Sequence, residues 1–347
     1  MSRARPPWLV AAVLCLGLLT GCQALGAPGE RPTEQAMTIR YHSGPGLMNH
    51  LELADALGYL EGTGIELDYE GPVAGGPEIL RSVATDQTDL GVGPFQGATA
   101  RVVSTGVDLT AVAATYGSNR AEGRTFDVVT LDDGGLDDAR DLIGGKVAVN
   151  TLGANAEAIL DTWFAQEGLT QDEIDDVALV PLPGINQEAA LREGQVDAAL
   201  MNGAARDFAM KHGNLRSLVR DVDLVGDYNG GSYVLRDSFI EAHPELTRTL
   251  VGVLVRAIRF EQAHSLAETR QVFARWLEEH GRSDELPVLE SWQGNGIATP
   301  GGVLRDEDFE LWTDWLEAEG QIDVDDLSIP DLYTNEFNPA AGERSNR

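Results

Sequence analysis

QTDLGV at residues 87–92 and QVDAA at residues 195–199 are two forms of one short pattern, in which a Gln-X-Asp turn leads into an apolar strand. Each follows the same order of segments, a strand, a glycine-containing turn and a helix, at residues 37–57 in the first copy and 147–166 in the second. Strands that alternate with helices form parallel sheets, because a parallel crossover needs a dozen or more residues to return. The sequence therefore predicts two related α/β lobes.

Helices are expected to cover these lobes in the last third of the chain. Residues 244–263, 266–280 and 306–319 carry apolar residues at three- and four-residue spacing, which is typical of helices that bury one face. Residues 126–131 and 232–235 read as extended crossings between the lobes. Two crossings permit hinge closure of a ligand cleft that lies between the lobes.

The crossings divide the chain into segments. We expect the first lobe to comprise residues 37–127 and 230–347, so that it is discontinuous in sequence, and the second lobe to comprise residues 128–229. In α/β sheets the carboxyl ends of strands lead into helix N-termini, whose free N–H groups make that edge the usual ligand site. Two such edges that face each other would form the cleft.

The first residues predict a secretory leader at residues 1–21. Arg3 and Arg5 precede an apolar run that ends in the sequence LTGC, and this run is too short for a membrane-spanning helix. The LTGC sequence resembles the lipobox of bacterial lipoproteins, which implies that Cys22 becomes the acylated membrane anchor. An ordinary signal peptide with an incidental cysteine is the alternative. Residues 22–36, rich in Gly, Pro, Glu and Gln, predict a flexible tether.

Cysteine count and charge exclude several functions. The chain has only two cysteines, Cys15 in the leader and Cys22, so the folded body can form no disulfide and can offer no thiolate nucleophile or cysteine metal ligand. Lysine and arginine total 25 against 56 acids, a formal net charge of −31, which makes nucleic acid an improbable partner. No motif predicts a metal or a cofactor.

The turns after two strands of the first lobe are candidate ligand contacts. Their glycines let a ligand approach the backbone, and first-turn N–H groups of a helix can donate to oxygen atoms. Each side chain also has a purely structural interpretation: His42 could be hydrogen-bonded within the protein, Ser43 could cap a helix and Phe95 could pack in the core. The predicted ligand-binding residues here are His42, Ser43, Gly44, Gly46, Phe95 and Gln96, together with Tyr116 after a third predicted strand at residues 110–114.

The second lobe offers equivalent turns, followed by the second crossing. Thr151 and Asn155 occupy the position that Ser43 has in the first copy, and could cap a helix or bind a solute. Because these turns contain no arginine, an anion would rely on N–H groups and on residues such as Arg120 or Arg206. The predicted ligand-binding residues here are Thr151, Gly153, Asn155, Asn202, Tyr228 and Asn229, the last two also being compatible with a plain hinge.

Five ordered segments carry a resemblance to a known family: ALGYL at 56–60, GIEL at 64–67, DLGVG at 89–93, DLIGGKVAV at 141–149 and GQVDAA at 194–199. Together they resemble the solute-binding proteins of nitrate-, taurine- and sulfonate-type ABC importers. This resemblance implies the type 2 periplasmic-binding-protein fold, an ABC permease as partner, and a ligand contact where Asn202 stands. A branch that makes or binds thiamine precursors carries a cysteine-rich motif that this sequence lacks.

These observations favour a monomeric, lipid-anchored protein at the extracytoplasmic face of the cell membrane. It would bind a small polar solute, such as a sulfonate, nitrate, a taurine-like compound or a nitrogen heterocycle, and deliver it to the permease. An enzyme of the same fold, acting on a small heterocycle or ester, is the alternative, although the chain has neither a Gly-X-Ser-X-Gly nor a His-Glu-X-X-His motif.

Overall fold

The computed structural model describes residues 36–43, 48–73, 75–323 and 327–343, and Ala36–Arg347 form one compact unit. The leader, Cys22, most of the tether, Gly44 and Gly46 lie outside the described residues. No helix in the described part of the chain is long and apolar enough to cross a membrane.

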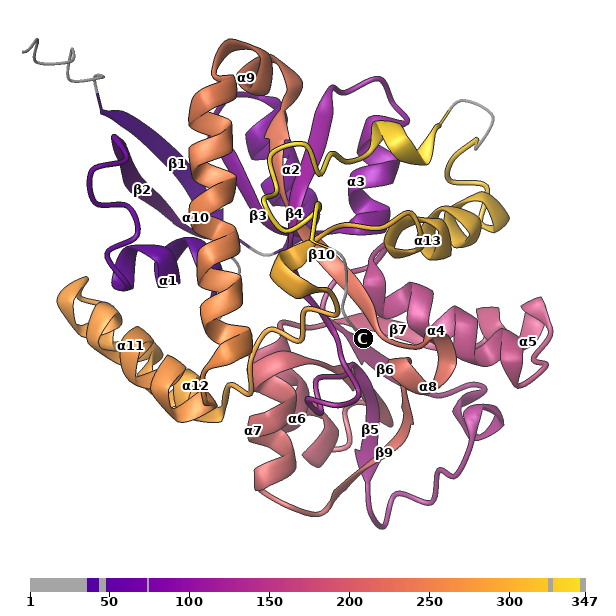
Figure 1. Ribbon diagram of the computed structural model, residues 1–347. Helices are drawn as coiled ribbons and strands as arrows, with labels where there is room; N and C mark the ends of the chain where they lie inside the picture. Colours follow the sequence, from indigo (N-terminus) through magenta and orange to yellow (C-terminus); the bar gives the residue numbers. More distant parts are fainter. Residues whose placement is uncertain (1–35, 44–47, 74, 324–326, 344–347) are drawn as a thin grey trace, which may run out of the picture. The chain divides into compact units, whose positions relative to one another are not determined.

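Two five-stranded sheets carry the fold (Figure 1). The first has the order β2-β1-β3-β10-β4 and the second the order β7-β6-β8-β5-β9. The strands of the first sheet are β1 (Met37–Ser43), β2 (Ile65–Pro72), β3 (Leu90–Phe95), β4 (Leu109–Ser118) and β10 (Tyr228–Arg236). Those of the second are β5 (Asp127–Leu131), β6 (Lys146–Val149), β7 (Ala178–Pro181), β8 (Ala198–Met201) and β9 (Leu215–Arg220).

The two sheets repeat one topology, as the duplicated sequence pattern predicts. In each sheet three strands pair in parallel, and a strand from a distant part of the chain is inserted antiparallel, β10 between β3 and β4 and β5 between β8 and β9. The expectation of purely parallel sheets is therefore wrong. Both inserted strands are the predicted crossings, and each joins the sheet that it enters instead of only bridging the two.

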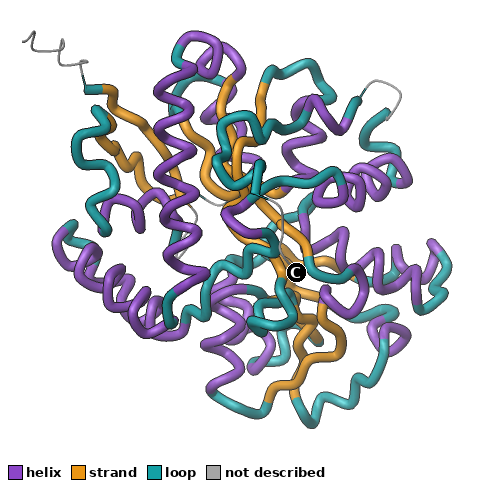
Figure 2. Tube along the Cα trace, in the orientation of Figure 1, coloured by secondary structure: helices purple, strands orange, loops and turns teal. Residues whose placement is uncertain are grey.

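Helices surround the strands in the tube drawing (Figure 2). The helices that follow strands are α1 (His50–Ala56), α2 (Gly76–Ala84), α3 (Gln96–Val103), α4 (Asn155–Gln166), α6 (Gly184–Arg192), α7 (Gly203–Lys211), α8 (Asp221–Val225) and α9 (Asp237–Ala242), and α5 (Gln171–Asp175) follows α4. The covering helices are α10 (Pro244–Ala263), α11 (Leu266–Glu279), α12 (Leu286–Ser291) and α13 (Glu307–Ala318). Short 3₁₀ turns are η1 (Ala139–Leu142), η2 (Ser283–Glu285), η3 (Pro300–Gly302) and η5 (Ile329–Asp331).

The three long covering helices confirm the predictions at residues 244–263, 266–280 and 306–319. Their ends follow local chemistry: Pro244 occupies the first turn of α10, and Ser265 caps α11 in a capping box with Glu268. The buried apolar core runs without a break from the first sheet to the second. Val234 of β10 and Val147 of β6 belong to the same cluster, together with Trp312 of α13.

Candidate functional site

Helix N-termini meet at the carboxyl ends of the strands. In the first sheet α3 starts at Gln96, directly after the end of β3, and in the second sheet α4 starts at Asn155, soon after β6. Gly153 in the second turn has a φ of 65°, a conformation that glycine adopts without strain. The residue before each helix makes no side-chain capping bond, so the first-turn N–H groups keep their donor capacity for another partner.

Four aromatic rings from separate elements pack around these turns. The ring of Trp312 lies edge-on to Phe95 at 4.9 Å and to Tyr228 at 5.3 Å, measured between centroids. Tyr116 completes the set beside β10, where a Cβ on Gly231 would lie only 2.2 Å from its Cε1 atom. Glycine is therefore required there for close approach of the tyrosine ring. We call these four residues the aromatic cluster.

Two amide side chains adjoin the aromatic cluster, one at the start of α3 and one at the start of α4. Gln96 is fully buried, and its Oε1 accepts a hydrogen bond from Ser232 Oγ at 2.9 Å. Asn155 is also buried, and its Nδ2 donates to the Tyr228 hydroxyl at 3.5 Å, the outer limit of a hydrogen bond. Gln96 Nε2 and Asn155 Oδ1 have no hydrogen-bond partner among the described residues. We call Gln96 and Asn155 the amide pair.

The buried carboxylate of Asp221 is linked to Asn155 through the Tyr228 hydroxyl. The Tyr228 hydroxyl donates to Asp221 Oδ2 at 2.8 Å, and Ser118 Oγ donates to the same oxygen. The other oxygen, Oδ1, accepts from the Val222 backbone N–H at 2.7 Å. Burial raises the pKa of Asp221 to about 6, so that the carboxylate is ionised at neutral pH. Burial likewise raises the pKa of Tyr228, whose hydroxyl therefore keeps its proton.

Two arginines, Arg124 before β5 and Arg206 on α7, are paired with acids. Arg124 Nη1 donates to Asp207 Oδ2 at 2.7 Å, and Arg206 binds Asp127 at 2.9 Å and Asp207 at 3.0 Å. Burial lowers the pKa of Arg124, and the neighbouring Asp207 opposes this effect. Arg124 lies beside the start of α7, with its Nη2 3.6 Å from the position of a Cβ on Gly203. The two positive charges of Arg124 and Arg206 are therefore balanced by the two negative charges of Asp127 and Asp207.

The structure brings five of the predicted site residues together: Phe95, Gln96, Tyr116, Asn155 and Tyr228. Sequence reasoning missed Trp312, Asp221 and Arg124. Trp312 sits on the apolar face of a covering helix, where nothing local separates a ligand wall from a core side chain. Arg124 lies two residues before the predicted crossing at 126–131, and this position in the sequence was the only local indication of its role.

Other predicted residues lie apart from the amide pair or have structural partners. His42 Nδ1 lies 3.0 Å from the Gly71 carbonyl oxygen, and Ser43 is buried at the end of β1. Asn229 is buried in a network with α13, where its Nδ2 donates to Asp308 Oδ2 at 2.8 Å. Asn202 precedes α7 without a side-chain capping bond.

Two predicted residues lie where the two sheets' turns approach each other. Thr151 Oγ1 is 3.2 Å from the position of a Cβ on Gly75, and Gly153 faces Arg101, whose Nη1 is 3.0 Å from the position of its Cβ. The suggested anion ligand Arg120 binds Asp223 at 2.5 Å near the surface instead. Arg206 forms the ion pairs with Asp127 and Asp207.

A groove of about 720 Å³ lies elsewhere, among α4, α5 and α13. Acidic and apolar side chains line it, including Asp161, Trp315 and Glu319, and it contains none of the buried unpaired atoms. We place the candidate site at the amide pair because unpaired buried polar atoms indicate a missing partner more directly than open volume does. Among the described residues no group of three or more His, Cys, Asp or Glu side chains could hold a metal ion.

Two similar α/β lobes, in which α3 and α4 begin at the buried amide pair, define a two-lobed periplasmic-binding architecture, the type 2 fold. The chain belongs to the NMT1/THI5-like family, whose model matches residues 49–265. No protein with a curated function matches the chain significantly in sequence.

Solved structures share the fold at low sequence identity. The alkanesulfonate-binding protein SsuA from Xanthomonas axonopodis pv. citri, bound to MOPS, has a TM-score of 0.65 and 18% identity, over 86% of this chain and 99% of that one. The periplasmic nitrate-binding protein NrtA from Synechocystis PCC 6803 has a TM-score of 0.64 and 12% identity, over 88% and 87%. A mutant of DszB in complex with biphenyl-2-sulfinic acid has a TM-score of 0.59 and 17% identity, over 86% and 97%.

Proposed function

We propose that the chain is the extracytoplasmic solute-binding component of an ABC importer, which carries a small polar solute to a permease without changing it. One observation carries the proposal: Gln96 Nε2 and Asn155 Oδ1 are buried, belong to helices that follow strands of different sheets, and lack a protein partner among the described residues. A buried polar atom left unpaired costs about 1 to 3 kcal/mol, so a solute that pairs with both is stabilised. SsuA and NrtA, which share the fold, bind alkanesulfonate and nitrate.

The same geometry supports a closing motion. A solute that touches both lobes stabilises the closed state by its greater affinity for that state. In this proposal residues 128–229 move as one lobe against residues 37–127 and 230–347, and the crossings carry the bend. Other expected contacts, such as Thr151 and Asn202, would line the closed cleft.

A thermal-shift panel tests the proposal, because a solute that binds the folded state raises its apparent stability. The panel contains alkanesulfonates, taurine, nitrate, amino acids, nitrogen heterocycles and aromatic acids. For the best solute, Gln96→Leu and Asn155→Leu should each weaken binding about tenfold or more in calorimetry. Gln195→Leu, which removes an exposed amide, is the matched control. Unchanged affinity in both cleft variants would place the site elsewhere.

A separate experiment tests whether the protein carries its solute without converting it. The bound solute should be recovered unchanged after long incubation with the protein, as mass spectrometry would show. DszB, solved with a sulfinic acid, makes this measurement necessary because it has a similar fold. A converted product would favour the enzyme alternative.

We also propose that Cys22 is acylated and anchors a monomer to the membrane. The LTGC sequence after an apolar run supports this assignment. Because each buried methylene of an acyl chain adds about 0.8 kcal/mol of membrane affinity, Cys22→Ala should release the protein into the soluble fraction. A variant that still sediments with membranes after detergent-free washing would contradict the anchor.

A further inference from the structure

The hydrogen bonds of Tyr228 determine which way the Asn155 side-chain amide is turned. A phenol has one hydrogen, and the Tyr228 hydroxyl gives it to Asp221 Oδ2 at 2.8 Å. The hydroxyl oxygen can then only accept, which it does from Asn155 Nδ2 at 3.5 Å. The nitrogen of the amide therefore faces Tyr228, and the acceptor atom Oδ1 is the one left without a partner among the described residues.

Asp221 fixes the direction of this chain of hydrogen bonds. It is fully buried and accepts from Ser118 Oγ, the Tyr228 hydroxyl and the Val222 N–H. An ionised carboxylate only accepts hydrogen bonds, so Tyr228 has to be the donor. Reversal of the Asn155 amide would set its oxygen against a hydroxyl oxygen that has no hydrogen left to give.

The opposite member of the amide pair has the complementary polarity. Gln96 Oε1 is occupied by Ser232 Oγ at 2.9 Å, which leaves Nε2 as a buried donor without a partner in the described part of the chain. Trp312 Nε1, on the ring that packs against Phe95, is a second buried donor of this kind. The site thus presents an acceptor at Asn155 and donors at Gln96 and Trp312, among flat aromatic walls.

We propose that the solute is a flat, uncharged molecule in which a hydrogen-bond donor is next to an acceptor, as in a lactam or a cyclic urea. The Asp221–Tyr228–Asn155 chain of hydrogen bonds leaves Asn155 Oδ1 as an acceptor, so the solute has to supply the donor. The proposal rests on the solute-binding function. Nitrate or an ionised sulfonate offers acceptors only and would leave Asn155 Oδ1 buried and unpaired. Arg124 and Arg206 are ion-paired with the buried Asp207 and Asp127, so their charge is neutralised within the protein, and the Nε–H of each is a further buried donor without a partner among the described residues.

Three probes of similar shape test the donor requirement by calorimetry or ligand-observed NMR: 2-pyridone, N-methyl-2-pyridone and benzenesulfonate. The first has an N–H next to a carbonyl, the second lacks that hydrogen, and the third is an acceptor-only anion. We expect 2-pyridone to bind about tenfold more tightly than either of the others. Equal or tighter binding of N-methyl-2-pyridone or benzenesulfonate would overturn the inference, as would failure of 2-pyridone to bind while any other solute of the panel does. Failure of every solute would instead overturn the proposed function.

Tyr228→Phe tests whether Tyr228 positions Asn155 or only packs beside it. Without the hydroxyl the amide can turn, so the ratio of the two pyridone affinities should fall from about tenfold toward one. Adding Asn155→Asp to this variant supplies an acceptor in either orientation and should restore the preference for the N–H probe. A purely structural role would weaken both probes equally and leave the ratio unchanged, which would overturn the positioning role. Tyr333→Phe removes a hydroxyl bonded to Asp306 outside the cluster and is the matched control.

Arg101 provides the test against an anionic solute. It donates to Gln321 Oε1 at 3.0 Å, lies beside Gly153, and has no carboxylate within ion-pair distance among the described residues. An uncharged solute held by the amide pair should bind Arg101→Gln within about twofold of the parent protein. A tenfold loss of affinity, about 1.4 kcal/mol, would show that charge at Arg101 holds the solute, and would overturn the inference.

Discussion

Asp161, on α4, is a half-buried acid without a cationic partner among the described residues. Trp315 Nε1 donates to its Oδ2 at 2.9 Å, but burial, with added repulsion from Glu157, Glu319 and Asp175, raises its pKa to about 6. The folded protein therefore holds this proton more tightly than the unfolded chain does. Its contribution to stability is fully present below about pH 4 and is lost as the pH rises through about 6.

Asp161→Asn removes this penalty and keeps an oxygen that can accept from Trp315. A rise of about two pKa units corresponds to about 3 kcal/mol, and solvent screening at this half-buried group reduces it, so we expect the variant to be more stable than the parent by about 1 to 2 kcal/mol at pH 7 and nearly equally stable at pH 4. Urea unfolding at the two pH values measures this difference. Asp172→Asn, at an exposed position of α5, is the control and should change neither value. A gain that does not depend on pH would contradict the assignment.

The sequence predicted where a site residue lies in the fold more easily than it predicted the residue's hydrogen-bond partners. Gln96 and Asn155 were predicted because they lie at the turns that follow strands, and chain order alone puts such residues at a sheet edge. The bond from Asn155 to Tyr228 joins residues 73 positions apart, and the one from Ser232 to Gln96 joins residues 136 apart. No local pattern contains these pairs, so the polarity of the site had to come from the fold.

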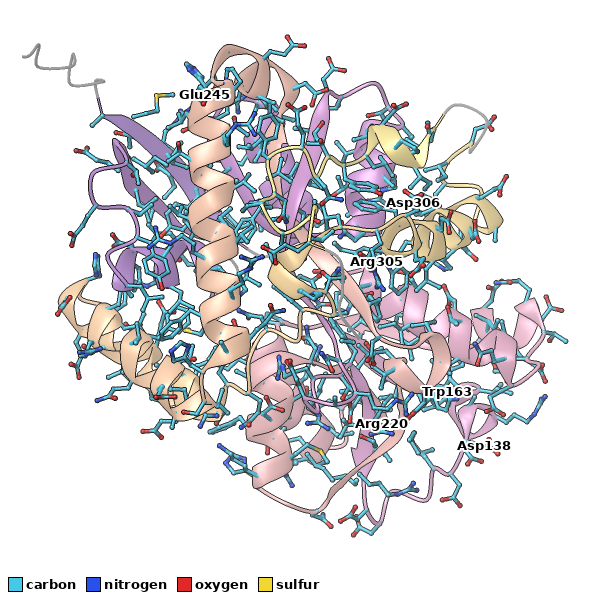
Figure 3. All side chains as sticks on the ribbon, viewed as in Figure 1. Asp138, Trp163, Arg220, Glu245, Arg305 and Asp306 are labelled. Atoms are coloured by element: carbon cyan, nitrogen blue, oxygen red, sulfur yellow. The ribbon has the colours of Figure 1, made fainter. Side chains whose placement is uncertain are left out.

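The element that links the aromatic cluster to the first sheet is α13. Its first turn carries Asp308, which is fully buried and accepts from the Asn229 N–H at 3.0 Å and from Arg305 Nη2 at 2.7 Å. Figure 3 shows Arg305 and Asp306 where α13 begins. Trp312 lies one turn further along the same helix, so its place against Tyr228 depends on this attachment to β10.

Asp308→Ala should therefore lower both stability and solute affinity. Loss of the acceptor leaves the Asn229 and Arg305 donors unpaired, at a cost of about 2 to 3 kcal/mol in urea unfolding. Affinity should fall together with stability, because Trp312 loses its fixed position. Asp314→Ala, at an exposed site on the same helix, should alter neither. Full affinity in a destabilised Asp308→Ala protein would show that α13 does not shape the site.

Helices with regular apolar spacing were predicted correctly, whereas the pairing of strands that are distant in sequence was not. The helices at residues 244–263, 266–280 and 306–319 follow from apolar spacing within each segment. The antiparallel insertion of β5 and β10 was missed, because the rule that alternating strands and helices pair in parallel holds only for consecutive strands. A strand that returns from a distant segment can enter the sheet in either direction, and its sequence does not say which.

At the scale of the whole molecule, the repeated topology suggests two bodies that meet at the amide pair. Thr151 lies beside Gly75, and Gly153 beside Arg101 of α3, so the turn after β6 approaches the turn before α2 and the helix α3 of the first sheet. The behaviour of a solute-free state follows from the proposed function: with no solute to pair with the buried amides, water should hydrate them and the lobes should separate.

This separation can be measured between two spin labels. Apart from Cys15 and Cys22 the chain has no cysteine, so Arg81→Cys on α2 and Ile185→Cys on α6, both exposed, can be labelled cleanly in a Cys22→Ala protein that begins after the leader. Saturating solute should shorten and narrow the distance distribution between the labels. The shift should vanish in Asn155→Leu at the same concentration, because a ligand moves the equilibrium only by its differential affinity for the two states. A control pair at Arg81 and Glu245, both beside the first sheet, should not respond. If the solute raises the Tm but leaves the distance between residues 81 and 185 unchanged, binding occurs without closure and the two crossings do not act as a hinge.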